Sequence, residues 1–401
     1  MTAGPAPCRP ARARNGAGAI AVSVAVLVSV AVLVAFPTTS SATGPPRLRA
    51  PLAAAVTTAT GSWAITAVGH LGDPLNTFWE LFFLAPGATR WSLVTPPGAA
   101  DNGGLVAGAS TSGTLTVGFE PSQLLRYSPL AQSGDGGTRW APALLPTSLA
   151  AMPDALAYEP AAPGVPGGAL ALSRSGRVLA GAASLGAWAP IATARMLDSL
   201  ASRSCGVEGL DAVALATGDV PLVGAGCRRG GRVGVFTRVG GAWRVTGPLL
   251  GGPLSGSATQ VLRLQAAGSV TTGLVEGRTA SHSGLVAIGR PSAGSWAVSA
   301  PLLLGERETL LSTATTAGGE QAVLLGSPGG RHVLELGSPN GPWAQLPAPP
   351  AATTTLAALD DGSVDAFSVH GSAVSVYRLA PGARTWGLVQ STVVPVAYGS
   401  S

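Results

Sequence analysis

The sequence predicts an all-β fold, a seven-bladed β-propeller of four-stranded blades that is preceded by one N-terminal hydrophobic helix. Three observations predict it: tryptophans recur at a nearly constant spacing, short apolar runs fill each interval, and glycine and proline are abundant. The chain of 401 residues contains 56 glycines and 33 prolines, which suits many short strands joined by tight turns. Hydrophobic residues make up 46% of the chain, enough for a core and too many for wholesale disorder.

Seven tryptophans mark the repeat. Each follows a turn-like cluster, and most precede a short apolar strand and a proline. They are Trp91, Trp140, Trp188, Trp243, Trp296, Trp343 and Trp386. Neighbouring members lie 43 to 55 residues apart, which is close to the length of a four-stranded propeller blade.

The last interval shows the expected strands of one blade. Apolar runs at Thr354–Leu359, Ser363–Val369 and Ser372–Leu379 are separated by turn residues, and Arg384–Gln390 carries the tryptophan. One such blade cannot cover both faces of its own sheet, whereas stacked blades in a closed ring can. A helical solenoid is disfavoured by the glycines and prolines, and a pair of β-sandwiches does not explain one tryptophan per unit.

Two segments resemble known propeller families. The serine, aspartate, glycine and tryptophan of a sialidase-type Asp box are matched by Ser133, Asp135, Gly137 and Trp140. The segment Val374–Trp386 resembles a unit of the kelch family, although we match the glycine pair of that family only to residues 230–231 and 329–330. The resemblance covers residues 51–395 as architecture, without matching either family motif by motif. In such families the Asp box stabilises a turn, which implies that role for Asp135.

The N-terminal region predicts export. Residues 17–36 form an apolar run with the length of a membrane span. Arg9, Arg12 and Arg14 precede it, which favours a cytoplasmic stub of residues 1–16. We expect a single span, a flexible linker at 37–50, the propeller outside the cell at 51–395, and a tail at 396–401. Secretion after cleavage near Ala42 stays an alternative, because small residues precede that position.

Cysteine usage agrees with export. Cys205 and Cys227 are the only pair beyond the hydrophobic run, and an even number outside the cell favours a disulfide. Two independent buried thiols are the alternative. If residues 210–217 and 220–226 form a hairpin, Cys205 lies on the incoming loop, and a fold-back of that loop brings the sulfurs together.

Charge and motif patterns narrow the function. Only 11% of residues are charged, and the exported part is nearly neutral, which gives no support for nucleic-acid binding. We predict no catalytic residues, no metal site and no cofactor, because the histidines are scattered without ligand spacing. The densest basic group surrounds the cysteines, and guanidinium groups there would suit a carboxylate or phosphate. Its members are Arg195, Arg203, Arg228 and Arg229.

The sequence therefore predicts a membrane-tethered binding or assembly scaffold at the cell envelope. Its partner would be an envelope or extracellular protein. A glycan-directed propeller, either lectin-like or a degenerate sialidase-like glycosidase, is the alternative. An enzyme with a site assembled from distant loops also stays open, although we expect a protein without catalytic activity.

Overall fold

The structure is a computed structural model that describes residues 51–73, 75–97, 101–110, 112–120, 128–141, 148–161, 167–201, 204–216, 218–267, 270–291 and 294–396. The predicted hydrophobic helix at 17–36 and the linker at 37–50 lie outside these residues. Among the described residues, no helix is long and apolar enough to cross a membrane.

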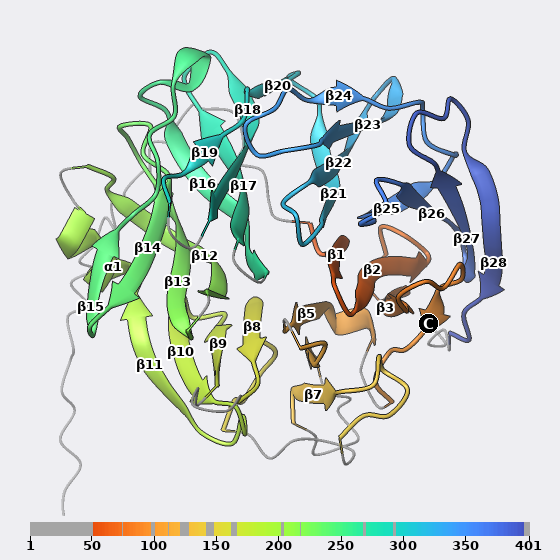
Figure 1. Ribbon diagram of the computed structural model, residues 1–401, viewed down its shortest axis with the longest axis horizontal. Helices are drawn as coiled ribbons and strands as arrows, with labels where there is room; N and C mark the ends of the chain where they lie inside the picture. The colour runs from red at the N-terminus through yellow and green to blue at the C-terminus, as the bar shows by residue number, and fades with distance from the viewer. Residues whose placement is uncertain are drawn as a thin grey trace, which may run out of the picture. The chain divides into compact units, whose positions relative to one another are not determined.

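Successive antiparallel meanders build the fold, and Figure 1 shows them arranged around a common centre. In the first half of the chain, the strands are β1 (Ala54–Thr58), β2 (Gly61–Gly69), β3 (Thr77–Leu84) and β4 (Ser92–Leu93); β5 (Leu105–Ala109), β6 (Leu115–Phe119) and β7 (Leu130–Ser133); and β8 (Ala155–Glu159), β9 (Gly168–Leu172), β10 (Arg177–Ala182) and β11 (Trp188–Thr193). A 3-10 turn, η1 (Asp101–Gly103), precedes β5.

The second half repeats the arrangement. Its strands are β12 (Val207–Ala216), β13 (Val220–Cys227), β14 (Gly234–Val239) and β15 (Ala242–Val245); β16 (Ala258–Ala267), β17 (Val270–Arg278), β18 (Ser283–Pro291), β19 (Ala297–Val298) and β20 (Leu302–Leu304); β21 (Thr309–Thr315), β22 (Gln321–Ser327), β23 (Gly330–Leu336) and β24 (Ala344–Gln345); and β25 (Thr353–Ala358), β26 (Val364–His370), β27 (Ala373–Leu379) and β28 (Gly387–Val393). One helix, α1 (Ala194–Ala201), precedes β12, and a second 3-10 turn, η2 (Gly252–Leu254), precedes β16.

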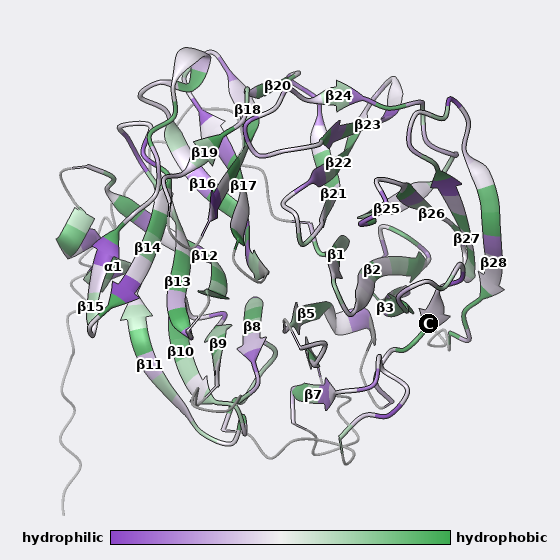
Figure 2. Cartoon of the chain, viewed as in Figure 1, coloured by the Kyte–Doolittle hydropathy of each residue, from purple (hydrophilic) through white to green (hydrophobic). Residues whose placement is uncertain are grey.

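Buried side chains fill the seams between neighbouring meanders. Leu81 of β3 packs in one cluster with Val117 of β6, and Leu285 of β18 packs in another with Val323 of β22. Figure 2 shows hydrophobic segments on strands around the whole ring. A further cluster joins the last meander to the first, through Phe367 of β26 and Phe82 of β3. Because buried clusters join neighbouring meanders and one of them joins the last meander to the first, the described fold is a β-propeller.

Six of the seven repeated tryptophans stand at or directly before the start of an outer strand, whereas Trp140 is followed by no strand among the described residues. Trp188 begins β11, for example, and Trp386 directly precedes β28. Several indole N–H groups donate across a seam to a carbonyl three or four residues after the preceding repeat tryptophan. These bonds are Trp140 Nε1 to Val94 O at 3.1 Å, Trp243 Nε1 to Ile191 O at 3.0 Å, Trp343 Nε1 to Ala300 O at 3.1 Å and Trp386 Nε1 to Pro347 O at 3.2 Å. The repeat therefore supplies a polar latch as well as apolar bulk.

Around the centre of the ring, the first meander is joined to the β21–β24 meander through their innermost strands. β1 pairs in parallel with β21, and Ala54 and Val56 lie opposite Thr313 and Thr315. β25 contacts both β1 and β21. The last meander thus packs behind this pairing, as Figure 1 shows at the right of the ring.

The predicted strands agree with the structure in the last meander, where each boundary falls within three residues of the expected one. The region 193–209 differs, because we expected a loop and the structure contains α1. The Thr193 hydroxyl accepts a hydrogen bond from the Met196 amide at 3.2 Å, as an N-cap does. Leu197 and Ala201 bury one face of the helix. The meander at 105–133 has three strands among the described residues. The segment after Trp140, where we expected its fourth strand, lies largely outside them.

Candidate functional site

A cavity of about 700 Å³ lies among the inner strands. Residues of β1, β5, β8, β12, β16 and β21 line it, whereas no described residue of β25 does. The β1–β21 pairing accounts for this, because it completes the wall in front of the last meander. The volume falls within the usual range for small-molecule sites.

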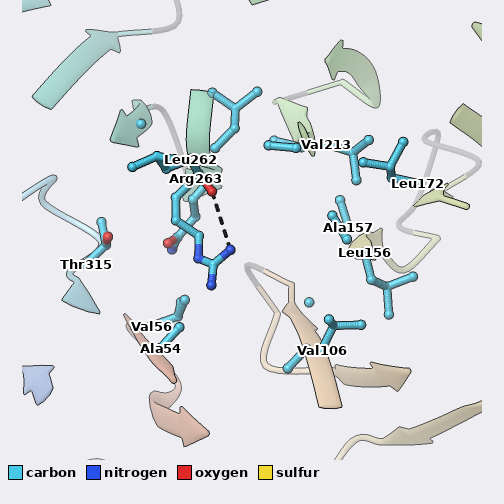
Figure 3. Close-up of a pocket in the computed structure, with 18 of the residues that line it drawn as sticks. Ala54, Val56, Val106, Leu156, Ala157, Leu172, Val213, Leu262, Arg263 and Thr315 are labelled. Carbon is cyan, nitrogen blue, oxygen red and sulfur yellow. Dashed lines mark hydrogen bonds between the residues drawn. The ribbon is translucent and has the colours of Figure 1, made fainter. Parts of the chain in front are cut away.

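Most of the wall is apolar. Figure 3 shows Ala54, Val56, Val106, Leu156 and Val213 around the open space. Ala54 and Val56 are two residues apart on β1 and half-buried, whereas Ala55 between them is buried in the core. The alternation of a β-strand thus turns one set of apolar side chains to the seam and the other to the cavity.

Arg263 is the one basic residue in this wall among the described residues. Its guanidinium extends into the open space in Figure 3, and Nη1 donates a hydrogen bond to the Leu262 carbonyl at 3.4 Å. Within the described residues, no carboxylate oxygen lies within 4 Å of it as an ion-pair partner. Desolvation lowers the pKa of Arg263 to about 10, so the group remains a cation at neutral pH.

A β-bulge aims Arg263 at the cavity. The register of β16 against β17 shifts between Val261 and Arg263. Val261 and Leu262 are consecutive and both fully buried, and they pack in two different clusters, Val261 toward β12–β14 and Leu262 toward β21 and β22. The bulge interrupts the regular alternation directly after them, where Arg263 lines the cavity. Shifts of the same kind interrupt β12 between Leu210 and Ala212, and β21 between Leu310 and Ser312.

Amide, carboxylate and hydroxyl groups also belong to the polar lining, the last from Tyr158, Thr272, Thr313 and Thr315. Gln260 Nε2 donates to Asp211 Oδ1 at 3.3 Å across the β12–β16 seam. Gln260 Oε1 is buried and accepts no hydrogen bond within the described part of the chain. Asp154 precedes β8 and Glu159 ends it, so their positions mark opposite ends of the inner strand. Burial raises the pKa of Asp154.

The predicted arginine group lies elsewhere. Arg195 is exposed on α1, Arg228 and Arg229 are exposed in the turn after β13, and Arg203 lies outside the described residues. The Arg228 and Arg229 amides donate to the carbonyls of Gly206 and Cys205 at 3.0 and 3.3 Å. These bonds hold the turn against the incoming loop, but none of the three described arginines lines the cavity. A shared anion site for the predicted group stays a prediction.

The predicted disulfide between Cys205 and Cys227 is confirmed. Its Cα atoms are 4.8 Å apart, and both cysteines are fully buried. Cys227 ends β13, and Cys205 follows α1, so the bond fastens the loop after the helix to the sheet. The Asp198 carboxylate adds a second tie by accepting the Val207 amide hydrogen bond at 2.7 Å.

Asp135 stabilises a turn, as the resemblance implied. Its carboxylate accepts hydrogen bonds from the Arg139 amide and the Ser133 hydroxyl, both at 2.9 Å. These bonds, led by the one from Arg139, lower the pKa of Asp135. Gly136 and Gly137 take positive φ values of 72° and 80° there, a conformation that glycine adopts without strain.

Sequence reasoning missed Arg263. The available signal was a charged residue between two leucines in a strand, Leu262-Arg263-Leu264. Such a residue stands out because charged side chains are almost never fully buried unless they are paired. Its convergence with β1, β5 and β8 depends on closure of the ring, which local sequence does not reveal.

Comparisons with known proteins identify no family. No family model matches the chain, and no curated protein matches it in sequence. Among solved structures, it is similar to YCF48 from Cyanidioschyzon merolae, with 15% identity, a TM-score of 0.44, and coverage of 84% of this chain and 97% of that one. The β-propeller domain of the Trilobed protease from Pyrococcus furiosus has 7% identity, a TM-score of 0.45 and coverage of 86% and 98%. A six-bladed fucose-binding lectin from Aleuria aurantia has 14% identity, a TM-score of 0.38 and coverage of 74% and 96%.

Proposed function

We propose that this chain is an exported, membrane-tethered, seven-bladed β-propeller that acts as a non-catalytic binding scaffold at the cell envelope and takes its ligand in the central cavity. The cavity is the observation that carries the proposal. A mostly apolar wall with a few convergent polar groups is the usual composition of a binding site. A cation and an unused amide acceptor give such a wall the means to orient a ligand.

The blade number rests on the match between repeat and structure. Each of the seven repeat tryptophans accompanies one antiparallel meander, from Trp91 beside β4 to Trp386 beside β28. In this proposal the last blade belongs to the ring but stands behind the β1–β21 pairing. It therefore contributes to closure more than to the binding site.

Export rests on two independent features. The buried disulfide suits an oxidising compartment, where such bonds form and persist. The apolar run at 17–36, with arginines before it, has the charge pattern of a segment with its N-terminus inside. Neither feature depends on the cavity, so location and binding are tested separately.

Location is tested by fractionation of cells that express the full chain. We expect the chain in the membrane fraction, with its propeller digested by protease added outside the cytoplasmic membrane. A soluble external form that begins near Thr43 would replace the anchor by a cleaved signal. A protease-protected chain with free thiols at Cys205 and Cys227 would reject export.

Binding is tested by native mass spectrometry of the full chain purified from its own membranes. We expect a bound small molecule that is lost in Val56→Trp, because the larger side chain occupies the cavity. Val239→Trp is the matched control, because Val239 is 53% exposed at the end of β14 and does not line the cavity. Retention of the same molecule in both variants would exclude the cavity, and recovery of a bound oligosaccharide would favour the glycan-directed alternative.

A further inference from the structure

We propose that the cavity ligand is a small amphipathic anion, a carboxylate or phosphate on an apolar body, and that Arg263 binds its charged group. This inference rests on the proposed function and assigns its ligand class. It starts from the contrast within the cavity between one guanidinium without an ion-pair partner among the described residues and a wall that is mostly apolar.

The guanidinium has unused binding capacity. It carries five N–H donors in a planar fork, and the structure shows one long hydrogen bond, from Nη1 to the Leu262 carbonyl at 3.4 Å. A carboxylate or phosphate can accept two parallel N–H bonds from such a fork. Since Arg263 has no ion-pair partner within the described residues, an incoming anion would supply the missing one.

The apolar wall selects the rest of the ligand. Val56, Val106 and Val213 surround the same space in Figure 3 and present no hydrogen-bonding groups. A hydrophilic anion such as acetate would leave that surface wet, whereas a hydrocarbon body would remove it from water. The ligand therefore needs both parts.

The carboxylates in the cavity wall favour the opposite ligand class, a cation. Asp154 and Glu159 mark the two ends of β8, and Asp211 is bonded to Gln260. If these acids dominate the potential, the cavity would prefer a cation. Arg263 opposes them from within the open space, where Figure 3 shows its guanidinium.

The experiment compares ligands that differ only in the head group. The full chain in lipid nanodiscs is titrated calorimetrically with 4-phenylbutanoate, 4-phenylbutyl phosphate, 4-phenylbutan-1-ol and 4-phenylbutylammonium, with empty nanodiscs as the blank. We expect at least one anion to bind at least tenfold more tightly than the alcohol, and the ammonium to bind most weakly. Acetate and inorganic phosphate test the need for the apolar body, and we expect no measurable binding of either.

Variants assign the effect to the residue. Arg263→Met should weaken anion binding at least tenfold and leave the affinity for the alcohol unchanged, while Arg263→Lys should retain part of the preference. Arg244→Met is the matched control, since Arg244 is exposed on β15, and it should change nothing.

Three results would overturn the assignment: equal affinities for anion and alcohol, a preference for the ammonium, or failure of all four ligands to bind at millimolar concentration. If the native small molecule is nevertheless lost in Val56→Trp, the proposed function stands and only the ligand class is wrong. If both experiments fail, the cavity is not the binding site.

Discussion

Two arginines from different regions of the molecule differ in how their guanidinium groups are paired. At the seam between the last meander and the first, Arg378 donates from Nε and Nη2 to the two carboxylate oxygens of Asp365, each at 2.7 Å. In the central cavity, Arg263 has only a long bond to a backbone carbonyl. The pKa of Arg378 is raised by its hydrogen bonds to Asp365, whereas desolvation lowers the pKa of Arg263 to about 10.

The difference separates a structural charge from one available to a ligand. Asp365 is fully buried and also accepts the Trp91 indole hydrogen bond at 2.8 Å. Gln390 brackets the backbone of Trp91, since its amide accepts from the Trp91 N–H and donates to the Trp91 carbonyl, both at 2.8 Å. These polar bonds connect the end of the chain to its beginning. No comparable network satisfies Arg263 within the described residues.

The largest expected effect is at the closing seam. Asp365→Asn removes the charge that pairs with Arg378 and should lower the free energy of unfolding by about 3 kcal/mol, because breaking one side of a buried pair leaves the other uncompensated. Urea denaturation of the full chain measures it. Glu120→Gln is the control, because it breaks the Arg174–Glu120 pair, whose side chains are 52% and 38% exposed. That change should lower the free energy of unfolding by less than about 1 kcal/mol. Equal losses of stability in the two variants would show that the buried Arg378–Asp365 pair stabilises the fold no more than an exposed pair does.

The second test concerns the disulfide. It closes a loop by a covalent bond, whereas the seam between the last meander and the first closes the ring by non-covalent contacts. Replacing Cys205 and Cys227 together by Ala should lower the free energy of unfolding by roughly 3 kcal/mol, the chain-entropy value for a loop of this size. Reductant should have the same effect on the wild-type chain and none on the double variant. A reductant effect that persists in the double variant would point to another cause.

Arg263→Met should raise the free energy of unfolding, whereas the two preceding changes should lower it. Its folded-state pKa of about 10 lies below the usual value, so folding disfavours the charged form. This penalty is complete at pH values below 10 and is lost as the pH rises toward the unfolded pKa. We therefore expect the ligand-free variant to be more stable than the wild type at pH 7, by about 1 kcal/mol after allowance for solvent screening, with the gap narrowing above pH 10. A destabilised variant would mean that Arg263 is part of the structural framework.

Sequence reasoning succeeded where the determinant is local or repeated. Apolar runs bounded by turn residues predicted β26 and β27, and the expected hairpin of β12 and β13 placed Cys205 near Cys227. Sequence reasoning failed where the structure depends on contacts between segments that are far apart in the chain. The pairing of β1 with β21 links residues more than 250 positions apart, and it decides which strands line the cavity. No local pattern marks that choice.

The missed helix has a different cause. α1 is eight residues long, so its apolar spacing provides only two turns of evidence. Thr193 and the spacing of Leu197 from Ala201 were available signals, but we interpreted the whole segment between two blades as a loop. Tertiary burial of those two residues stabilises a helix that would be marginal alone.

The smallest expected effect tests whether the repeated tryptophans act as latches or only as apolar bulk. Trp243 Nε1 donates to the Ile191 carbonyl across a seam at 3.0 Å, whereas Trp296 Nε1 is buried and has no hydrogen-bond partner within the described residues. Both substitutions to Phe remove a similar volume, but only Trp243→Phe leaves a carbonyl without its donor. It should therefore lower the free energy of unfolding by about 1 kcal/mol more than Trp296→Phe does. The Arg290 guanidinium lies 4.9 Å from the Trp296 ring centre, and Phe keeps an aromatic face for it, so this contact should alter the difference little. Equal losses, measured by urea denaturation in parallel, would reduce the role of the repeat to packing alone.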